Sequence, residues 1–168
     1  MIDAVLSLGS NVGDCKAAID SAVVRLAALP ESTVAARSSY YRTAPVGPVD
    51  QAWFVNIAVV LHTTLGRSGL EKACRAVETA LGRDRAREIP WGPRTIDIDL
   101  IAVAGDTGPP HRELANGYVI VPLAEIAPDM IVAGRTVAQV RSAADATGVE
   151  KLLWPIPPSD PAPAGQPG

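Results

Sequence analysis

Two extended segments follow one another in this chain with no helix between them, and this order restricts the fold more than any other feature. Residues 33–46 form the first segment, and residues 53–64 alternate as a strand should. A strand pattern at residues 4–11 precedes the pair and another at 95–103 follows it, each separated from the pair by a helix pattern. The order βαββαβ predicts an α+β, ferredoxin-like core, a four-stranded antiparallel sheet covered by helices. A doubly wound sheet is disfavoured, because it needs a helix between consecutive strands.

The two helix patterns have recognisable ends. The first helix is predicted to begin after Asp14 as its cap and to end at Pro30. The second should begin with a capping box formed by Ser68 and Glu71 and should end at Gly82. Its apolar stripe is predicted at Leu70, Ala73, Cys74, Val77 and Leu81.

The last third of the chain has weaker patterns and is predicted to hold C-terminal additions to the core. Residues 104–117 form a loop, residues 118–123 a short apolar segment, and residues 125–130 a helical turn. A further helix is expected within residues 136–153. Six prolines among the last fourteen residues predict disorder. We therefore expect one domain over residues 1–154 and a disordered tail over 155–168.

Charge and composition exclude several classes of partner. The net charge of −3 disfavours nucleic acid, because such binders present a basic surface. The apolar run at residues 57–61 is too short to cross a membrane, and the N-terminus lacks the basic start of a signal peptide. Cys15 and Cys74 form no motif, which fits a reducing compartment. We expect a cytoplasmic protein, a monomer, that acts on small molecules.

The strongest chemical signal is the pair Asp97 and Asp99 on the fourth strand. Residues at i and i+2 leave a strand on the same side, roughly 6.5–7 Å apart. Their repulsion would cost about 2.5 kcal/mol at an effective dielectric of ~20. Two hard oxygen ligands at this spacing suit Mg²⁺ that carries a nucleotide phosphate. The competing interpretation is a solvated polar face on an edge strand.

An arginine-rich segment precedes this pair. Residues 83–94 hold four arginines against two acidic residues, with Pro90, Trp91 and Gly92 making the segment rich in turns. Phosphoryl transfer depends on cationic groups placed around the phosphate oxygens. The competing interpretation for a single arginine is a surface ion pair, which is favoured for Arg87 and disfavoured for Arg94.

Two further motifs are ambiguous. Asn56 should leave its strand beside Phe54, where an amide and an aromatic ring suit the edge and face of a heterocycle. A buried asparagine with internal partners is the alternative. Gly9-Ser10-Asn11 follows the first strand but lacks the phosphate-binding GxxxxGK[ST] pattern, so a plain turn with a capping residue is the better interpretation.

The chain resembles the 6-hydroxymethyl-7,8-dihydropterin pyrophosphokinase family over residues 4–133. The resemblance rests on LSLGSNVGD, on SSYYRTAPVGPVDQAWFVNIAVVL, on ETALGRDR, on WGPRTIDIDLI and on VPLAEIAPDM. It implies a ferredoxin-like fold, ATP as diphosphate donor, two Mg²⁺ ions and AMP as product. The other product would be the dihydropterin diphosphate, and the reaction would be a step of folate biosynthesis.

The resemblance also implies site residues. Asp97 and Asp99 would bind Mg²⁺, and Arg83 and Arg94 would stabilise the transferred diphosphate as catalytic groups. The pterin would be bound by Thr43, Ala44, Val46, Phe54, Asn56 and Tyr118, with Phe54 and Tyr118 stacking on its faces. The nucleotide would be bound by Arg75, Glu78, Arg85, Trp91, Arg94, Leu100 and His111.

This sequence departs from the family pattern at several positions. Ala44 replaces a usual proline, and Arg75 stands where the family often has glutamine. The 104–117 segment is short, and the stretch 110–113 matches a Pro-His-Pro-Arg run only in its first two residues. Asn116 stands where the family has an arginine. Two other classes therefore compete with the enzyme: a non-catalytic pterin- or nucleotide-binding module, and a small metal-independent phosphatase of the acylphosphatase kind.

Overall fold

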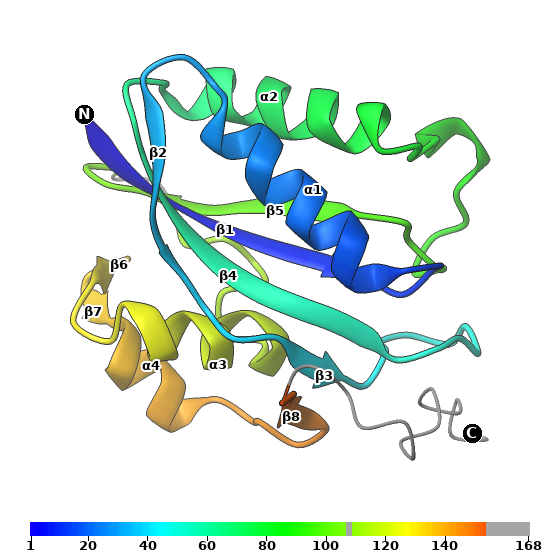
Figure 1. Cartoon of the computed structure of the whole chain (residues 1–168). Coiled ribbons are helices and arrows are strands. Elements are labelled where there is room, and N and C mark those ends of the chain that lie inside the picture. The colour runs from blue at the N-terminus through cyan, green and yellow to red at the C-terminus, as the bar shows by residue number, and fades with distance from the viewer. Residues whose placement is uncertain (107–108, 154–168) are drawn as a thin grey trace.

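The computed structural model describes residues 1–106 and 109–153, and a six-stranded antiparallel sheet is its centre. The sheet is ordered β5-β1-β4-β3-β8, and β2 also pairs with β4 (Figure 1). The strands are β1 (Ile2–Ser10), β2 (Ser32–Arg37), β3 (Tyr41–Thr43), β4 (Phe54–Thr63), β5 (Asp97–Val103) and β8 (Val149–Lys151). The first five follow the predicted βαββαβ order, with the first of the two extended segments (residues 33–46) divided into β2 and β3, so the α+β prediction is confirmed.

Helices cover both faces of the sheet. Helices α1 (Cys15–Ala27) and α2 (Arg67–Ala80) lie on one face, and α3 (Gly117–Ile126) and α4 (Val137–Ala143) lie on the other (Figure 1). A 3₁₀ turn, η1 (Arg85–Arg87), interrupts the α2–β5 loop, and β6 (Ile131–Val132) and β7 (Arg135–Thr136) form a small separate hairpin.

The central strand β1 explains why its sequence is a continuous apolar run. It pairs with β4 on one side and with β5 on the other, and residues 4–10 are buried. Leu6 and Leu8 pack toward α1 and α2, while Val5 packs toward α3 and α4. A strand covered on both faces needs apolar side chains on both, as parallel central strands do.

The predicted helix ends were correct in part. Asp14 caps α1, since its side chain accepts a hydrogen bond from the Ala17 amide at 3.0 Å. The prediction of a capping box at Ser68 and Glu71 is wrong. Helix α2 begins at Arg67, and its N-cap residue, Gly66, makes no side-chain hydrogen bond. Gly82 follows the end of α2 with φ of 91°, the left-handed conformation that glycine favours.

The C-terminal third differs most from expectation. The apolar segment 118–123 is the body of α3, which ends at Ile126, so the turn expected at 125–130 is only partly helical. The helix expected within 136–153 covers only Val137–Ala143. Gly148 is left-handed with φ of 72°, and the chain then continues as β8 on the edge of the sheet. The tail at 155–168 lies outside the described residues. Within the described part, no helix is both long and apolar enough to cross a membrane.

Candidate active site

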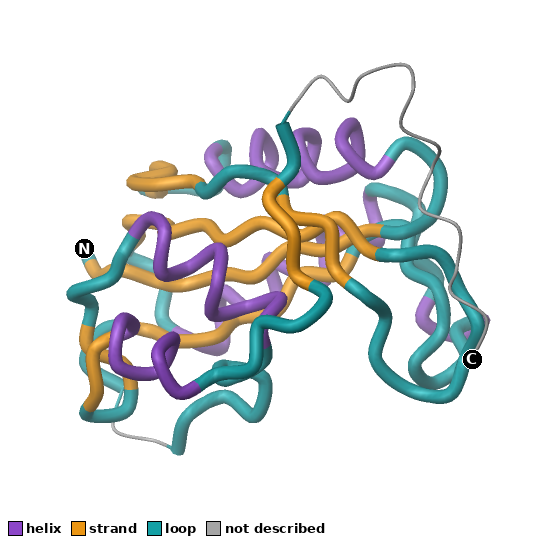
Figure 2. The backbone as a smooth tube through the Cα atoms, turned by 90° about the horizontal axis from the view of Figure 1, so that it is seen from below, coloured by secondary structure: helices purple, strands orange, loops and turns teal. Residues whose placement is uncertain are grey.

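Three loops meet at one end of the sheet. The β1–α1 turn, the β3–β4 loop and the α2–β5 loop lie together at this end, as the long loops of Figure 2 also show. The β3–β4 loop and the α2–β5 loop, together with Arg112, Glu113 and Tyr118, line a pocket of about 470 Å³. Its floor is the part of the sheet that α3 leaves uncovered, with Ser7 and Gly9 from β1, Asn56 from β4 and the two aspartates of β5.

Asp97 and Asp99 lie on this floor, as their spacing predicted. Ile98 between them is 5% exposed and packs in the core beneath α2, so the two carboxylates leave the other face. The register pairs Asp99 with Ser7 and Asp97 with Gly9. Serine has a small side chain and glycine has none, so there is room above β1. Burial, together with the negative charges of Asp97 and Glu113, raises the pKa of Asp99 to about 7. The pocket therefore concentrates acidic oxygen atoms where a cation would relieve their repulsion.

Arg83 lines the pocket from within a network of buried charges. Its side chain is 5% exposed and donates to Glu78 at 2.6 Å, to Glu88 at 2.5 Å and to Asp97. Burial alone would lower the pKa of Arg83, but the hydrogen bond to Glu88 and the charges of Asp97 and Glu78 raise it. The guanidinium thus already holds one of the two aspartates.

Glu78 anchors this network from α2. It is 1% exposed, accepts a hydrogen bond from the Ile98 amide at 2.8 Å and pairs with Arg85 at 2.5 Å. A buried carboxylate is tolerated when it is paired and fully hydrogen-bonded. Glu78 therefore fixes β5 and the start of the arginine loop (residues 83–94) relative to each other. Because it is beneath the floor, its predicted contact with nucleotide would have to act through these partners.

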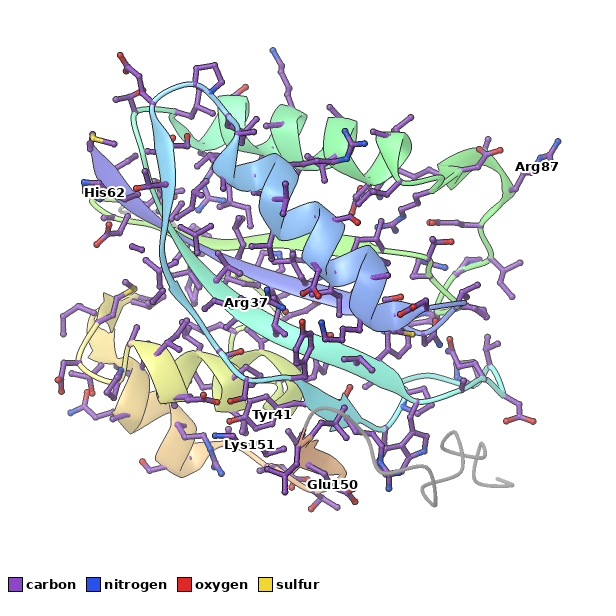
Figure 3. The ribbon with its side chains drawn as sticks, viewed as in Figure 1. Arg37, Tyr41, His62, Arg87, Glu150 and Lys151 are labelled. Atoms are coloured by element: carbon purple, nitrogen blue, oxygen red, sulfur yellow. The ribbon has the colours of Figure 1, made fainter. Side chains whose placement is uncertain are left out.

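Several other residues of the arginine loop line the pocket. Arg94 donates to the Gly92 carbonyl at 2.9 Å and lies 3.4 Å from Glu88, and its side chain is 14% exposed. Trp91 also lines the pocket and is 58% exposed. Arg87 points into solvent at the tip of the loop and pairs with Asp84, which confirms its interpretation as a surface residue (Figure 3).

The opposite side of the pocket has neutral polar and aromatic groups. The Asn56 amide donates to the Thr43 hydroxyl at 2.6 Å. Gly9 lies directly beneath, because a Cβ at that position would come within 2.4 Å of the Asn56 Oδ1 atom. Phe54 and Tyr118 both line the same pocket, and burial together with the nearby Glu113 raises the pKa of Tyr118.

The departure at Ala44 has a structural counterpart. The Ala44 amide donates to the Gly148 carbonyl at 2.9 Å and so extends the pairing of β3 with β8. Proline has no amide hydrogen and could not make this bond. Ala44 and Val46 both line the pocket, so the C-terminal strand supports the start of the 44–53 loop.

Besides Glu78, three more of the predicted nucleotide residues are outside the pocket lining in the described part of the chain. Arg75 is exposed on α2, and Leu100 packs in the core at 6% exposure. His111 accepts a hydrogen bond from the Glu113 amide at 3.3 Å and does not reach the lining. Sequence reasoning missed Glu88, Gln51 and Glu113, which do line it. No motif marked these three residues, because their importance comes from contacts between distant segments.

Comparison with known proteins identifies close relatives. Residues 5–128 match the family described as 7,8-dihydro-6-hydroxymethylpterin-pyrophosphokinase (HPPK). A protein of Methylorubrum extorquens named 2-amino-4-hydroxy-6-hydroxymethyldihydropteridine pyrophosphokinase is 46% identical over 159 residues, 90% of this chain and 99% of its own. A protein of the same name from Pseudomonas aeruginosa is 34% identical over 155 residues, 88% of this chain and 94% of its own.

One solved structure is similar at a greater distance. The chain described as "Crystal Structure Analysis of the HPPK-DHPS in complex with substrates" aligns with 89% of this chain and 36% of its own length. The TM-score is 0.45 and the sequence identity is 12%. This likeness is too distant to support an argument about the present chain.

Proposed function

This chain belongs to the 7,8-dihydro-6-hydroxymethylpterin-pyrophosphokinase family, and from this premise we propose which residues of its pocket carry out the transfer. The protein is a pyrophosphokinase of the folate pathway that transfers pyrophosphate to hydroxymethyldihydropterin, and ATP is the family's donor substrate. Family membership decides against the phosphatase and the non-catalytic module. The finer proposal is that the donor is MgATP, that AMP leaves, and that the two substrates occupy opposite sides of one pocket.

The observation that carries this proposal is the pair Asp97 and Asp99 on the pocket floor. Their oxygen atoms fit Mg²⁺, which prefers hard oxygen ligands and takes others from phosphate and water. The pKa of Asp99 is raised first by burial and then by the negative charges of Asp97 and Glu113, and a bound cation would offset both effects. Within the described residues no group of three or more acidic, histidine or cysteine side chains could hold a metal alone, so substrate oxygens would complete the site. Two bound Mg²⁺ ions would neutralise the negative charge of the triphosphate.

The arginine loop would act on the same phosphate groups from above. Arg94 lines the pocket three residues before Asp97, and Arg85 lines it from η1. Guanidinium groups aimed at the phosphate oxygens stabilise the charge that the transferred group carries. Arg83 would serve first by fixing Asp97, since its hydrogen bonds are directed to carboxylates within the protein. Trp91, at the rim, would cover the nucleotide.

The pterin would occupy the neutral side of the pocket. The Asn56 side chain can pair with the edge of a heterocycle, while the hydroxyl of Thr43 holds its orientation. Phe54 and Tyr118 offer aromatic faces for stacking, and Ala44 and Val46 complete the wall. Thr43, Phe54 and Asn56 are all uncharged, which suits a neutral ring.

The test is product analysis with purified protein, ATP, Mg²⁺ and 6-hydroxymethyl-7,8-dihydropterin. We expect AMP and the pterin diphosphate in equal amounts. Formation of ADP with orthophosphate would contradict diphosphate transfer. Nucleotide consumption that is independent of the pterin would contradict the proposed second substrate.

The remaining expectations concern the state of the protein. We propose a cytoplasmic monomer that needs only small-molecule substrates. Neither Cys15 nor Cys74 forms a disulfide within the described residues, and Cys74 is 3% exposed on the buried side of α2, which is compatible with a reducing compartment. Sedimentation at micromolar concentration should give the mass of one chain, and a dimer would contradict the proposal.

A further inference from the structure

The C-terminal segment, residues 145–151, packs behind the pterin side of the pocket, although the family match ends at residue 128. It leads from α4 into β8, which pairs with β3 at the edge of the sheet (Figure 1). The sequence predicted no site residue in this segment, which was expected to be helical. None of its residues lines the larger pocket in the described chain. Any effect on binding would therefore pass through the walls that the segment supports.

The first of these walls is the end of β3. Thr43 pairs with Val149, and the Ala44 amide donates to the Gly148 carbonyl at 2.9 Å. The approach is close, because a Cβ at Gly148 would come within 3.0 Å of the Ala44 Cβ atom. Thr43 in turn accepts the hydrogen bond that orients Asn56. The C-terminal segment thus supports both the wall at Ala44 and the hydroxyl that holds Asn56.

The second wall is the first turn of α3. A Cβ at Gly117 would come within 2.7 Å of the Asp145 carbonyl oxygen and within 2.9 Å of the Val149 Cγ2 atom. Tyr118 follows directly and lines the larger pocket as one of the two proposed stacking groups. Because such close packing leaves little space for movement, the C-terminal segment determines where this turn of α3 lies.

A second pocket, of about 230 Å³, lies between the two walls and the C-terminal segment. The residues that line both pockets are Thr43, Ala44, Val46 and Tyr118. The C-terminal segment contributes residue 145 and residues 147–149 to the smaller pocket. The shared residues are therefore bordered by open space on that side, and the close contacts at Gly148 and Gly117 limit how far they can move into it.

Ion pairs also hold the C-terminal segment to the rest of the protein. Glu150 and Lys151 project from β8 (Figure 3). The Glu150 carboxylate lies 3.0 Å from the Arg42 guanidinium, which stacks on the Trp53 ring at 4.8 Å. The Lys151 ammonium lies 3.6 Å from Glu125. Pairs as exposed as these contribute little individually. Backbone pairing with β3 and the glycine contacts therefore determine the position of the segment.

We propose that the C-terminal segment is a positioning element for the pterin, and that Gly148 and Gly117 are its positioning residues. Through these two contacts it sets the separation between the β3 wall and Tyr118, and so the width of the slot for a flat ring. The inference rests on the proposed function of the pocket. The arginine loop lies on the opposite side of the pocket, so affinity for the nucleotide should not depend on this segment.

The experiment is calorimetric titration with two ligands. A non-hydrolysable MgATP analogue is titrated alone, and the pterin substrate is then titrated into protein saturated with that analogue. Gly148→Ala should weaken pterin binding by about tenfold, because its Cβ displaces Ala44, while affinity for the analogue stays within about twofold. Gly134→Ala is the matched control, since Gly134 is also left-handed, with φ of 78°, but a Cβ there meets no atom within 4 Å. It should bind both ligands as wild type does.

Gly117→Ala tests the other wall. Gly117 is not left-handed, so this variant adds the contact without the backbone strain, and it should also weaken the pterin alone by about tenfold. Wild-type affinity for the pterin in either folded variant would overturn the inference, whatever its melting temperature. Equal weakening of both ligands, the result of a general loss of structure, would overturn it as well. If wild-type protein with bound analogue took up no pterin, the proposed function would fail before any variant was compared.

Discussion

The two halves of one sheet face differ sharply, although the same strands form both. In the half beneath α3 and α4, β1, β4 and β5 present Val5, Ala58 and Ile101, all buried in an apolar cluster. Two residues further along β1, and two residues back along the antiparallel strands β4 and β5, the same face presents Ser7, Asn56 and Asp99 and lines the pocket. A distance of only two residues along each strand therefore separates the packed core from the polar site.

The difference shows what decides where a site can form on an α+β sheet. Strand alternation determines which residues share a face, but it does not determine how much of that face a later helix covers. Here α3 is ten residues long and begins at the edge of the pocket, where Tyr118 lines it, so the helix leaves the loop end of the sheet uncovered. The covered half should contribute to stability and the open half to chemistry, and the following substitutions test this division.

The largest effect is expected in the open half. Asp99→Asn should lower kcat by about a thousandfold, because a cation ligand at the reacting phosphate is lost. The folded state should not be destabilised, since the substitution also removes a repulsive charge. Steady-state kinetics and thermal unfolding measure the two effects. Exposed Asp129 provides the control, and Asp129→Asn should leave both values unchanged. Near-normal turnover in Asp99→Asn would remove the metal role.

The covered half should respond in the opposite way. Ile101 is 2% exposed, and Ile101→Ala should lower the free energy of unfolding by about 2–4 kcal/mol through lost burial and a residual cavity. The kcat/KM of the folded fraction should stay within about twofold of wild type. Urea denaturation gives the first value. If activity fell more than stability predicts, the division between the halves would be wrong.

A smaller effect is expected where the open half approaches the pterin. Gly9→Ala places a methyl group 2.4 Å from the Asn56 Oδ1 atom, so Asn56 must move. The KM for pterin should rise by about tenfold, equivalent to about 1.4 kcal/mol, while the KM for ATP changes little. Gly66→Ala is the matched control, because a Cβ there meets no atom within 4 Å. A rise in both KM values would show that Gly9 serves the whole pocket.

The smallest effect links pH to metal binding. The pKa of Asp99 is raised to about 7 in the folded protein, so the folded state holds this proton more tightly than the unfolded state does. For the metal-free protein this contribution makes stability fall as pH rises from about 4 to about 7. Saturating Mg²⁺ should therefore raise the melting temperature by a few degrees more at pH 8 than at pH 5.5. Equal shifts at the two pH values would show that Asp99 does not titrate in this range.

Much of this arrangement could be predicted from local patterns. Alternation and element order gave the antiparallel sheet, and the i, i+2 spacing put Asp97 and Asp99 on one face. Glu78 was singled out only by the family resemblance, as a nucleotide residue; its burial and its hydrogen bond to β5 are contacts that no local pattern encodes. The C-terminal helix was predicted too long because the left-handed Gly148 and the pairing of β8 with β3 depend on tertiary structure.

The most direct test of the acidic pair is anomalous diffraction from crystals grown with Mn²⁺ and a non-hydrolysable ATP analogue. We expect a manganese peak within bonding distance of carboxylate oxygens from both Asp97 and Asp99, and also of the analogue's phosphates. A peak at another place, or nucleotide bound with both carboxylates turned away from it, would contradict the account.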